Sequence, residues 1–212
     1  MEGYDVEKLL DGITRFRRED FEAHKELFTA LGGSQKPHTL FISCSDSRID
    51  PNMITGTKPG ELFIIRNIAN LVPPYRESDE YLATTSAIEY AVLTLEVENI
   101  VVCGHSNCGG CAASMKSEEE MAGLPHTKKW LELMKPVRDK VLERFGEDEP
   151  EAREWYMEQG NVVEQLRHLM TFPYIKERVE AGSLILSGWY YIIETGEIFI
   201  YDDECGLFNC KN

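Results

Sequence analysis

The sequence predicts an α/β fold with a mainly parallel central sheet, an antiparallel edge strand, flanking helices and an N-terminal helical arm. Short apolar runs alternate with longer stretches in which apolar residues recur every three or four positions, a pattern typical of strands joined by helices. Two of the apolar runs end in loops rich in Cys, His, Asp and Arg, which is where parallel sheets carry their sites. Near the C-terminus, Thr195-Gly196 separates two further runs and indicates a hairpin, so the last strand is expected to be antiparallel.

The N-terminal third of the chain supplies the arm and two strands. Residues 1–34 read as helix, rich in Glu, Lys and Leu, and the pattern breaks at Gly32-Gly33. Residues 39–43 (TLFIS) form a short apolar run, which predicts a buried strand. A second apolar run at residues 62–65 follows the turn signal Pro59-Gly60 and predicts the next strand.

The middle of the chain alternates between helix and strand signals. A helix is expected from Ser78, a capping residue followed by two acidic residues that favour a helix N-terminus. Residues 100–103 predict a third buried strand, and a helix is expected to begin near Asn107. Residues 127–145 and 151–170 then read as amphipathic helices.

Two late strands, residues 183–191 and 197–201, complete the predicted elements. No repeat, low-complexity block or linker divides the chain, and its length fits one core, so a single domain is expected. The expected segments are a helical arm (1–34), a metal-site core (35–116), a helical scaffold (117–181), and C-terminal strands with a tail (182–212).

The composition limits the partners of the protein. The 22 Lys and Arg against 37 Asp and Glu give a formal net charge of −15. Nucleic acid and anionic membranes attract basic surfaces, so neither is expected as a partner, whereas a small-molecule substrate remains compatible with an acidic protein. The N-terminus lacks the pattern of a signal peptide and no apolar run has the length of a membrane span, which predicts a cytoplasmic protein.

Three residues in the two polar loops have the chemistry of metal ligands. Cys44 follows the first predicted strand, and His105 and Cys108 follow the third. Two thiolates and one imidazole leave the fourth position of a tetrahedral zinc open, as in catalytic sites. Cys108 lies at a predicted helix N-terminus, which lowers a thiol pKa and favours the thiolate. The alternative is a core histidine beside a buried cysteine.

The remaining cysteines permit two rival interpretations. Cys108-Gly-Gly-Cys111 has the spacing of a dithiol redox pair, and Cys103 added to it gives the spacing of a plant-type iron–sulfur protein. Because Cys103 lies inside a predicted strand, we expect it to be a small buried hydrophobe and Cys111 to pack its helix. Cys205 and Cys210 lie in the C-terminal tail, and no role is expected for them.

Asp46 and Arg48 lie on the loop after Cys44. An Asp-x-Arg pair is usually an exposed ion pair that contributes little. Beside a metal-binding thiolate the pair gains a function, because a guanidinium orients a carboxylate and keeps it ionised. Asp46 would then accept a hydrogen bond from a metal-bound hydroxide or bind the metal itself.

Several longer motifs occur in order along the chain. They are CSDSR at 44–48, PGELFIIRNIANLVPPY at 59–75, AIEYAV at 87–92, GHSNCGG at 104–110 and GWYYIIETGEIFIYD at 188–202. Together they resemble the β-class carbonic anhydrases, from about Gln35 to Gly110 and again in the late segment. Within that family, the VPPY segment looks more like the plant-type branch.

The resemblance implies a role for each residue of the two loops. Cys44, His105 and Cys108 would bind Zn²⁺, one ion per chain. Asp46 and Arg48 would form the catalytic dyad.

The resemblance also implies a substrate pocket and an oligomer. Gln35 would donate a hydrogen bond to the substrate, and Phe63 and Tyr90 would line an apolar CO2 pocket. In this family the cleft lies at a dimer interface, which implies a homodimer or homotetramer whose partner chain supplies some lining residues. Without the resemblance, Phe63 would be strand core, Tyr90 helix packing and Gln35 an ordinary loop residue.

The implied activity is that of a zinc lyase, a carbonate dehydratase that hydrates CO2 reversibly to bicarbonate by attack of a zinc-bound hydroxide. Hydrolysis of carbonyl sulfide or carbon disulfide stays open, because these substrates are linear like CO2 and proteins of similar fold and identical ligands use them. From a different class, an iron–sulfur or dithiol electron carrier also stays open.

Overall fold

A computed structural model of the chain describes residues 6–77 and 82–211. It divides into two compact units, Met1–Lys36 and Pro37–Asn212, which are described one at a time. None of the helices within residues 6–77 and 82–211 is both long and apolar enough to cross a lipid bilayer.

The first unit is helical, as the sequence predicts, but three helices replace one continuous arm. They are α1 (Val6–Arg18), α2 (Asp20–Ala23) and α3 (Lys25–Leu31), and the last ends at Gly32 as expected. Three phenylalanines pack their rings together across the breaks, with centroid separations of 5.3–6.4 Å between Phe16, Phe21 and Phe28. This cluster holds the short helices together, because helices of this length are unstable alone.

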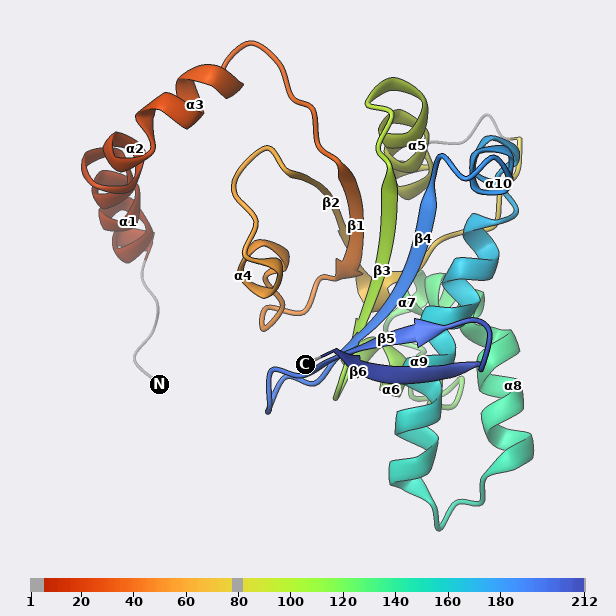
Figure 1. Cartoon of the computed structure of the whole chain (residues 1–212). Coiled ribbons are helices and arrows are strands. Elements are labelled where there is room, and N and C mark those ends of the chain that lie inside the picture. The colour runs from red at the N-terminus through yellow and green to blue at the C-terminus, as the bar shows by residue number, and fades with distance from the viewer. Residues whose placement is uncertain (1–5, 78–81, 212) are drawn as a thin grey trace. The chain divides into compact units, whose positions relative to one another are not determined.

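The second unit is built on a six-stranded sheet in the order β2-β1-β3-β4-β5-β6 (Figure 1). The strands are β1 (Thr39–Cys44), β2 (Leu62–Asn67), β3 (Asn99–His105), β4 (Ile185–Tyr191), β5 (Ile198–Asp202) and β6 (Leu207–Lys211). The first four strands in sequence are parallel, and β5 and β6 run antiparallel to their neighbours. The predicted α/β class is therefore confirmed, although the sheet has a second antiparallel strand, β6, that the sequence analysis did not identify.

Strand β1 is an inner strand of the sheet, between β2 and β3, and is buried along its whole length. Leu40 and Ile42 pack into the main core with Ile100 and Val102 of β3, which explains the unbroken apolar runs in both strands. The two strands pair in parallel with Ser43 opposite Cys103. Their carboxyl ends consequently meet at one edge of the sheet, as the sequence analysis predicted for neighbouring strands.

Helices flank this sheet (Figure 1). They are α4 (Pro51–Thr55), α5 (Ala83–Glu89), α6 (Gly109–Ser114), α7 (Pro125–Leu131), α8 (Lys135–Arg144), α9 (Pro150–Leu169) and α10 (Pro173–Glu180). A 3₁₀ turn, Glu132–Met134, divides the helix predicted at 127–145 into α7 and α8. Pro136 lies in the first turn of α8 and has no N–H to donate to the preceding turn, so the α-helix cannot continue across it.

Helix α5 falls within the helix that the sequence predicts from Ser78 onward. Its proposed capping residue, Ser78, lies outside the described residues, and α5 starts at Ala83. A single π-helical turn, Tyr90–Thr94, follows α5 and carries the helical pattern up to Leu95.

Helix α9 approaches β3 and β4 closely because both strands have a glycine beneath it. A Cβ atom on Gly104 would lie 2.6 Å from Val162 Cγ2, and one on Gly188 would lie 2.9 Å from Val162 Cγ1 and 3.0 Å from Leu166 Cδ1. The first two distances are shorter than real carbon contacts and the third is unusually tight, so a side chain at either strand position would force its neighbours to shift. The close approach places α9 directly behind the edge where β1 and β3 end.

We predict that Gly188→Ala destabilises the protein by about 1–3 kcal/mol, because it overpacks the contact with Val162 and Leu166. Gly123→Ala is the matched control, since nothing lies within 4 Å of a Cβ at that position. Urea unfolding of the two variants and the parent measures the difference. Partial recovery of stability in Gly188→Ala/Val162→Ala would localise the effect, whereas equal stability of Gly188→Ala and the parent would contradict it.

Candidate metal centre

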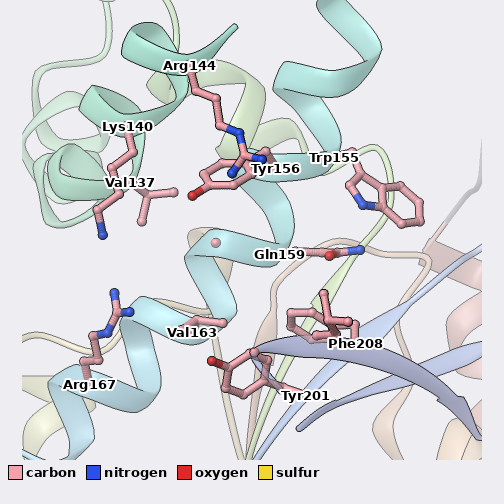
Figure 2. Close-up of a pocket in the computed structure, with 13 residues that line it drawn as sticks. Val137, Lys140, Arg144, Trp155, Tyr156, Gln159, Val163, Arg167, Tyr201 and Phe208 are labelled. Carbon is pink, nitrogen blue, oxygen red and sulfur yellow. The ribbon is translucent and has the colours of Figure 1, made fainter. Parts of the chain in front are cut away.

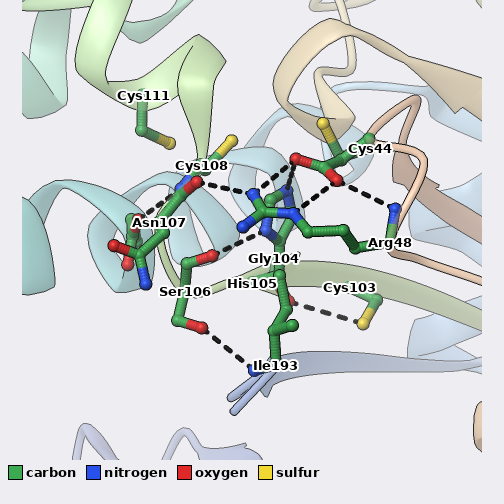
Figure 3. A network of polar contacts seen from close by, with 12 residues as sticks. Cys44, Arg48, Cys103, Gly104, His105, Ser106, Asn107, Cys108, Cys111 and Ile193 are labelled. Carbon is green, nitrogen blue, oxygen red and sulfur yellow. Dashed lines mark hydrogen bonds and ion pairs between the residues drawn. The ribbon is translucent and has the colours of Figure 1, made fainter. Parts of the chain in front are cut away.

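Three potential ligands meet where β1 and β3 end. Cys44 is the last residue of β1, His105 is the last residue of β3, and Cys108 is the N-cap of α6 (Figure 3). One ligand atom from each residue lies within 4.8 Å of the other two, and all three side chains are buried. The parallel pairing of β1 with β3 produces this arrangement, because it aligns two loops that are far apart in sequence.

The imidazole of His105 is oriented like that of a metal ligand. Its Nδ1 lies 2.9 Å from the carbonyl oxygen of Ser106, an acceptor that fixes the ring and places the proton on Nδ1. Its Nε2 is buried and has no hydrogen-bond partner among the described residues. A buried polar nitrogen without a partner is costly, and a metal bound at Nε2 would satisfy it.

The two thiols require a positive charge nearby if they are to ionise. The neighbouring Cys108 thiol, followed by burial, raises the pKa of Cys44 to about 12. The expectation that the helix N-terminus lowers the Cys108 pKa is wrong: the pKa is raised to about 12, and the neighbouring Cys111 thiol is the largest influence that raises it. A divalent cation reverses this balance, because a coordinating thiol is deprotonated outright. Two sulfurs and one imidazole nitrogen are a donor set of zinc, so these residues fit the ion that the sequence predicts.

Asp46 is held beside these donors by two arginines. Arg48 donates from Nε to Oδ1 at 2.9 Å and from Nη2 to Oδ2 at 2.7 Å, and its backbone N–H donates to Oδ1 at 3.0 Å. Arg66 donates to the carbonyl oxygens of Cys44 (3.1 Å) and Asp46 (2.6 Å), which fixes the backbone of the loop. The Arg48 hydrogen bonds hold the Asp46 pKa well below its usual range, although burial opposes them. An ionised carboxylate oxygen, Oδ2, thus lies 4.0 Å from His105 Nε2.

The loop between His105 and Cys108 is held by a residue that the sequence analysis missed. Asn107 has a φ of 54°, in the left-handed region that asparagine tolerates. Its carbonyl oxygen accepts from Arg48 Nη2 (3.0 Å), and its side-chain amide donates to Glu194 Oε1 (2.7 Å). Glu194, in the turn after β4, also accepts from the Ser106 hydroxyl (3.1 Å). The β4–β5 turn therefore positions the same loop that positions Arg48.

A buried carboxylate behind Cys108 was also missed. Glu158 of α9 is 2% exposed. It accepts from the Cys108 backbone N–H (2.8 Å) and from the Tyr190 hydroxyl (2.6 Å). Burial, the largest influence, raises the Glu158 pKa. Glu158 satisfies the amide at the start of α6, and so it fixes the backbone that carries one candidate ligand.

Two further polar residues of α9 accompany Glu158 on its buried face. Asn161 donates to the Ala69 carbonyl (2.9 Å), and Gln165 accepts from the Val72 N–H (2.8 Å) and donates to Asn161 (2.9 Å). Glu158, Asn161 and Gln165 recur at spacings of three and four residues. This polar row within an apolar helical stripe is the signal in the sequence that could have identified them.

The other cysteines lie as the sequence analysis expects. Cys103 is buried with Phe41 and Val101, in a different cluster from Cys44 and Cys111 (Figure 3). Cys103 therefore cannot join Cys108 and Cys111 around an iron–sulfur cluster. Cys111 is buried in the helix packing. The late residues Cys205 and Cys210 are exposed, although Cys210 lies in strand β6 and not in a tail as expected.

The predicted pocket residues lie away from the three donors within one chain. Phe63 and Tyr90 contact each other, with ring centroids 6.0 Å apart. Phe63 lies opposite Leu40, four residues before Cys44 along β1, which is roughly 13 Å at ~3.3 Å per residue. Gln35 belongs to the first unit, and its role stays a prediction.

Comparisons with known proteins all find carbonic anhydrases. A family model described as carbonic anhydrase matches residues 39–198. The chain is 40% identical over 200 residues to a carbonic anhydrase of Helicobacter pylori, covering 93% of this chain and 90% of the relative. A carbonic anhydrase of Synechocystis sp. is 40% identical over 197 residues, covering 93% of this chain and 71% of the relative.

Solved structures give the same result. The structure of the β-carbonic anhydrase CcaA superposes with a TM-score of 0.90 at 38% identity, covering 97% of this chain and 99% of the other. A tetrameric β-carbonic anhydrase of Sordaria macrospora superposes with a TM-score of 0.77 at 33% identity, covering 91% of this chain and 94% of the other.

We predict that Glu158→Ala destabilises the protein by about 2–4 kcal/mol, because it leaves two buried donors, the Cys108 amide and the Tyr190 hydroxyl, without an acceptor. Glu158→Gln should lose less, since its amide oxygen still accepts from Cys108. Glu154→Ala, an exposed change on the same helix, is the control. Denaturant unfolding measures all three, and a Glu158→Ala variant as stable as the control would contradict the assignment.

Proposed function

The chain belongs to the β-carbonic anhydrase family, and on this premise we propose that it is a zinc-dependent carbonate dehydratase that hydrates CO2 reversibly to bicarbonate. The observation that carries the proposal is the meeting of two thiols and one unpartnered imidazole nitrogen beside an ionised carboxylate. Members of this family are lyases. The finer features proposed below are the metal, the role of each residue and the assembly.

Cys44, His105 and Cys108 would hold the zinc. The donor chemistry supports this assignment, because two sulfurs and one imidazole are zinc ligands and leave a fourth position free. Zinc, when bound, would acidify a water so that a hydroxide nucleophile is available near neutral pH.

Asp46 would orient the attacking oxygen. Its Oδ2 lies close to the three candidate ligands, 4.0 Å from His105 Nε2, and Arg48 keeps the carboxylate ionised. An ionised carboxylate can only accept a hydrogen bond. Asp46 therefore accepts a hydrogen bond from the O–H of the attacking oxygen, and a lone pair of that oxygen is left directed at CO2. Arg48 fixes the carboxylate through a bidentate contact, and Asn107 and Glu194 fix the guanidinium in turn.

The substrate pocket would be completed by a second copy of the chain. Phe63 and Tyr90 form an apolar pair away from the donors of their own chain, and Tyr90 is 46% exposed. Strand β2 is an edge of the sheet, and its Ile64 is 37% exposed; Leu93, three residues after Tyr90, is 53% exposed. Edge strands with exposed apolar residues are normally covered. We propose a homodimer or homotetramer in which Phe63 and Tyr90 line the partner's pocket, and the tetrameric relative from Sordaria macrospora supports the assembly. The hydrogen bond from Gln35 to the substrate stays a prediction from the resemblance.

Stopped-flow CO2 hydration by the purified protein tests the function directly, with carbonyl sulfide and carbon disulfide turnover measured in parallel. Rapid CO2 hydration with negligible hydrolysis of the sulfur compounds is the expected result. Fast carbonyl sulfide turnover with slow CO2 hydration would instead assign the chain to the hydrolases that share these ligands. The position of Cys103 argues against the iron–sulfur form of the electron-carrier alternative. The plant-type branch stays a prediction.

The metal assignment predicts different outcomes for two neighbouring cysteines. Cys108→Ser should lose most of its zinc, because a hydroxyl is a far poorer zinc ligand than a thiolate. Cys111→Ser, the matched control on the same helix, should retain about one zinc per chain, as the parent does. Metal analysis after dialysis against a weak chelator measures both. Equal zinc in the two variants, or loss only from Cys111→Ser, would contradict the ligand set.

If Asp46 and Arg48 are the catalytic dyad, substituting either residue should slow CO2 hydration without removing zinc. Asp46→Asn should lower kcat/KM for CO2 by about 10²–10³, since an amide replaces an aimed and charged acceptor. Arg48→Ala should also slow the reaction, because Asp46 loses its two side-chain hydrogen bonds. The control is Asp139→Asn, which removes an exposed ion pair with Lys135. Near-parental rates in both dyad variants at full zinc content would leave Asp46 and Arg48 as a surface ion pair only.

A further inference from the structure

A second concave site lies on the other side of α9 from the candidate metal centre. It is a pocket of 410 Å³ between α8, α9 and the β5–β6 hairpin (Figure 2). Its size falls within the range of small-ligand sites. None of the metal ligands, dyad residues or predicted pocket residues lines it.

The pocket is basic in an acidic protein. Lys140 and Arg144 of α8 and Arg167 of α9 line it, and no Asp or Glu does, although the chain has 37 acidic residues against 22 basic ones. Figure 2 shows the charged ends of Lys140 and Arg167 pointing toward one another. Like charges that face each other across a cavity repel, and an anion between them would remove that repulsion.

The three cations differ in how far the protein already neutralises them. Arg167 pairs with Glu164 at 2.9 Å, a carboxylate outside the pocket lining. Arg144 lies over the Tyr156 ring, 5.3 Å from its centroid, a contact that orients the guanidinium without neutralising it. Lys140 forms no ion pair with any carboxylate of residues 6–77 or 82–211. At least two positive charges therefore remain for a ligand.

Aromatic rings form the rest of the wall. Tyr201 of β5 and Phe208 of β6 contact each other with centroids 5.2 Å apart. Trp155 is 48% exposed, and its ring makes an edge-to-face contact with Tyr190, with centroids 5.4 Å apart. Figure 2 shows Trp155 and Phe208 on the side of the pocket opposite Lys140. An exposed indole leaves a large apolar surface on which a flat ring can pack.

We propose that this pocket binds a small aromatic phosphate, with the phosphate between Lys140, Arg144 and Arg167 and the aromatic ring against Trp155 and Phe208. Guanidinium groups match a phosphate through paired N–H donors, and the ammonium of Lys140 adds a point charge. A site for inorganic phosphate would need no aromatic wall, and a site for an apolar ligand would need no cations. The presence of both therefore favours a ligand that has a phosphate and an aromatic ring. An aryl phosphate and a nucleoside monophosphate share the chemistry that both halves recognise.

The test is isothermal titration of the full-length protein, with tryptophan fluorescence as a second readout. The probes are phenyl phosphate and adenosine monophosphate, against inorganic phosphate (charge only) and benzyl alcohol (ring only). At least one aromatic phosphate should bind at least about tenfold more tightly than either half-ligand. Tighter binding of phenyl phosphate or of the nucleotide identifies which of the two the pocket prefers.

Variants localise the binding. The double substitution Lys140→Gln/Arg144→Gln should weaken binding of the aromatic phosphate by about tenfold or more, because charge-assisted hydrogen bonds are lost. Lys176→Gln, which changes an exposed cation of α10, is the control and should bind like the parent. The fluorescence response should disappear in Trp155→Phe while titration heat remains. Binding that survives the double substitution would lie elsewhere, for example at the metal centre, and would overturn the proposal, as would equal binding of inorganic phosphate.

Discussion

The parallel pairing of β1 with β3 is the constraint on which the candidate metal centre depends. It sets Ser43 opposite Cys103 and brings the carboxyl ends of two strands to the same edge, although α4, β2 and α5 lie between Cys44 and His105 in the sequence. A slip of one residue in β1 would turn Cys44 to the other face of the sheet, toward Phe41 and Cys103. The buried apolar residues Leu40 and Ile42 prevent that slip, because it would exchange them with Phe41 and Ser43 on the opposite face.

The candidate metal centre also depends on helix α9, whose side chains hydrogen-bond the backbone around the centre. Two glycines let it lie close to β3 and β4, and its buried polar row then reaches the backbone around the centre. A buried carboxylate such as Glu158 is tolerated only with donors to satisfy it, and the Cys108 amide and the Tyr190 hydroxyl supply them. The opposite side of the same helix carries the basic pocket, so one helix separates the candidate metal centre from the proposed phosphate site.

The sequence predicted those features that have a local signal. The apolar runs at 39–43 and 100–103 are strands, and their polar ends meet as expected. Strand β6 was missed because most of its residues are exposed and show no clear alternation. Glu194 was missed because its partners lie 87 and 88 positions away. The polar row of α9 marks Glu158 as unusual, but its partners lie 50 and 32 positions away and so its contacts could not be predicted. The pairing of Phe63 with Tyr90 away from the metal ligands also has no local signal, since it depends on which strand lies at the edge.

The central claim is that the strand pairing assembles two sulfur donors and one nitrogen donor, and no more, around one metal. X-ray absorption at the zinc edge of the metal-loaded protein measures this set directly. The account predicts two Zn–S distances near ~2.3 Å and two lighter ligands, one of them an imidazole, near ~2.0–2.1 Å. Four sulfur ligands, or one sulfur with three lighter atoms, would contradict it, because the pairing of β1 with β3 would then not determine the donors.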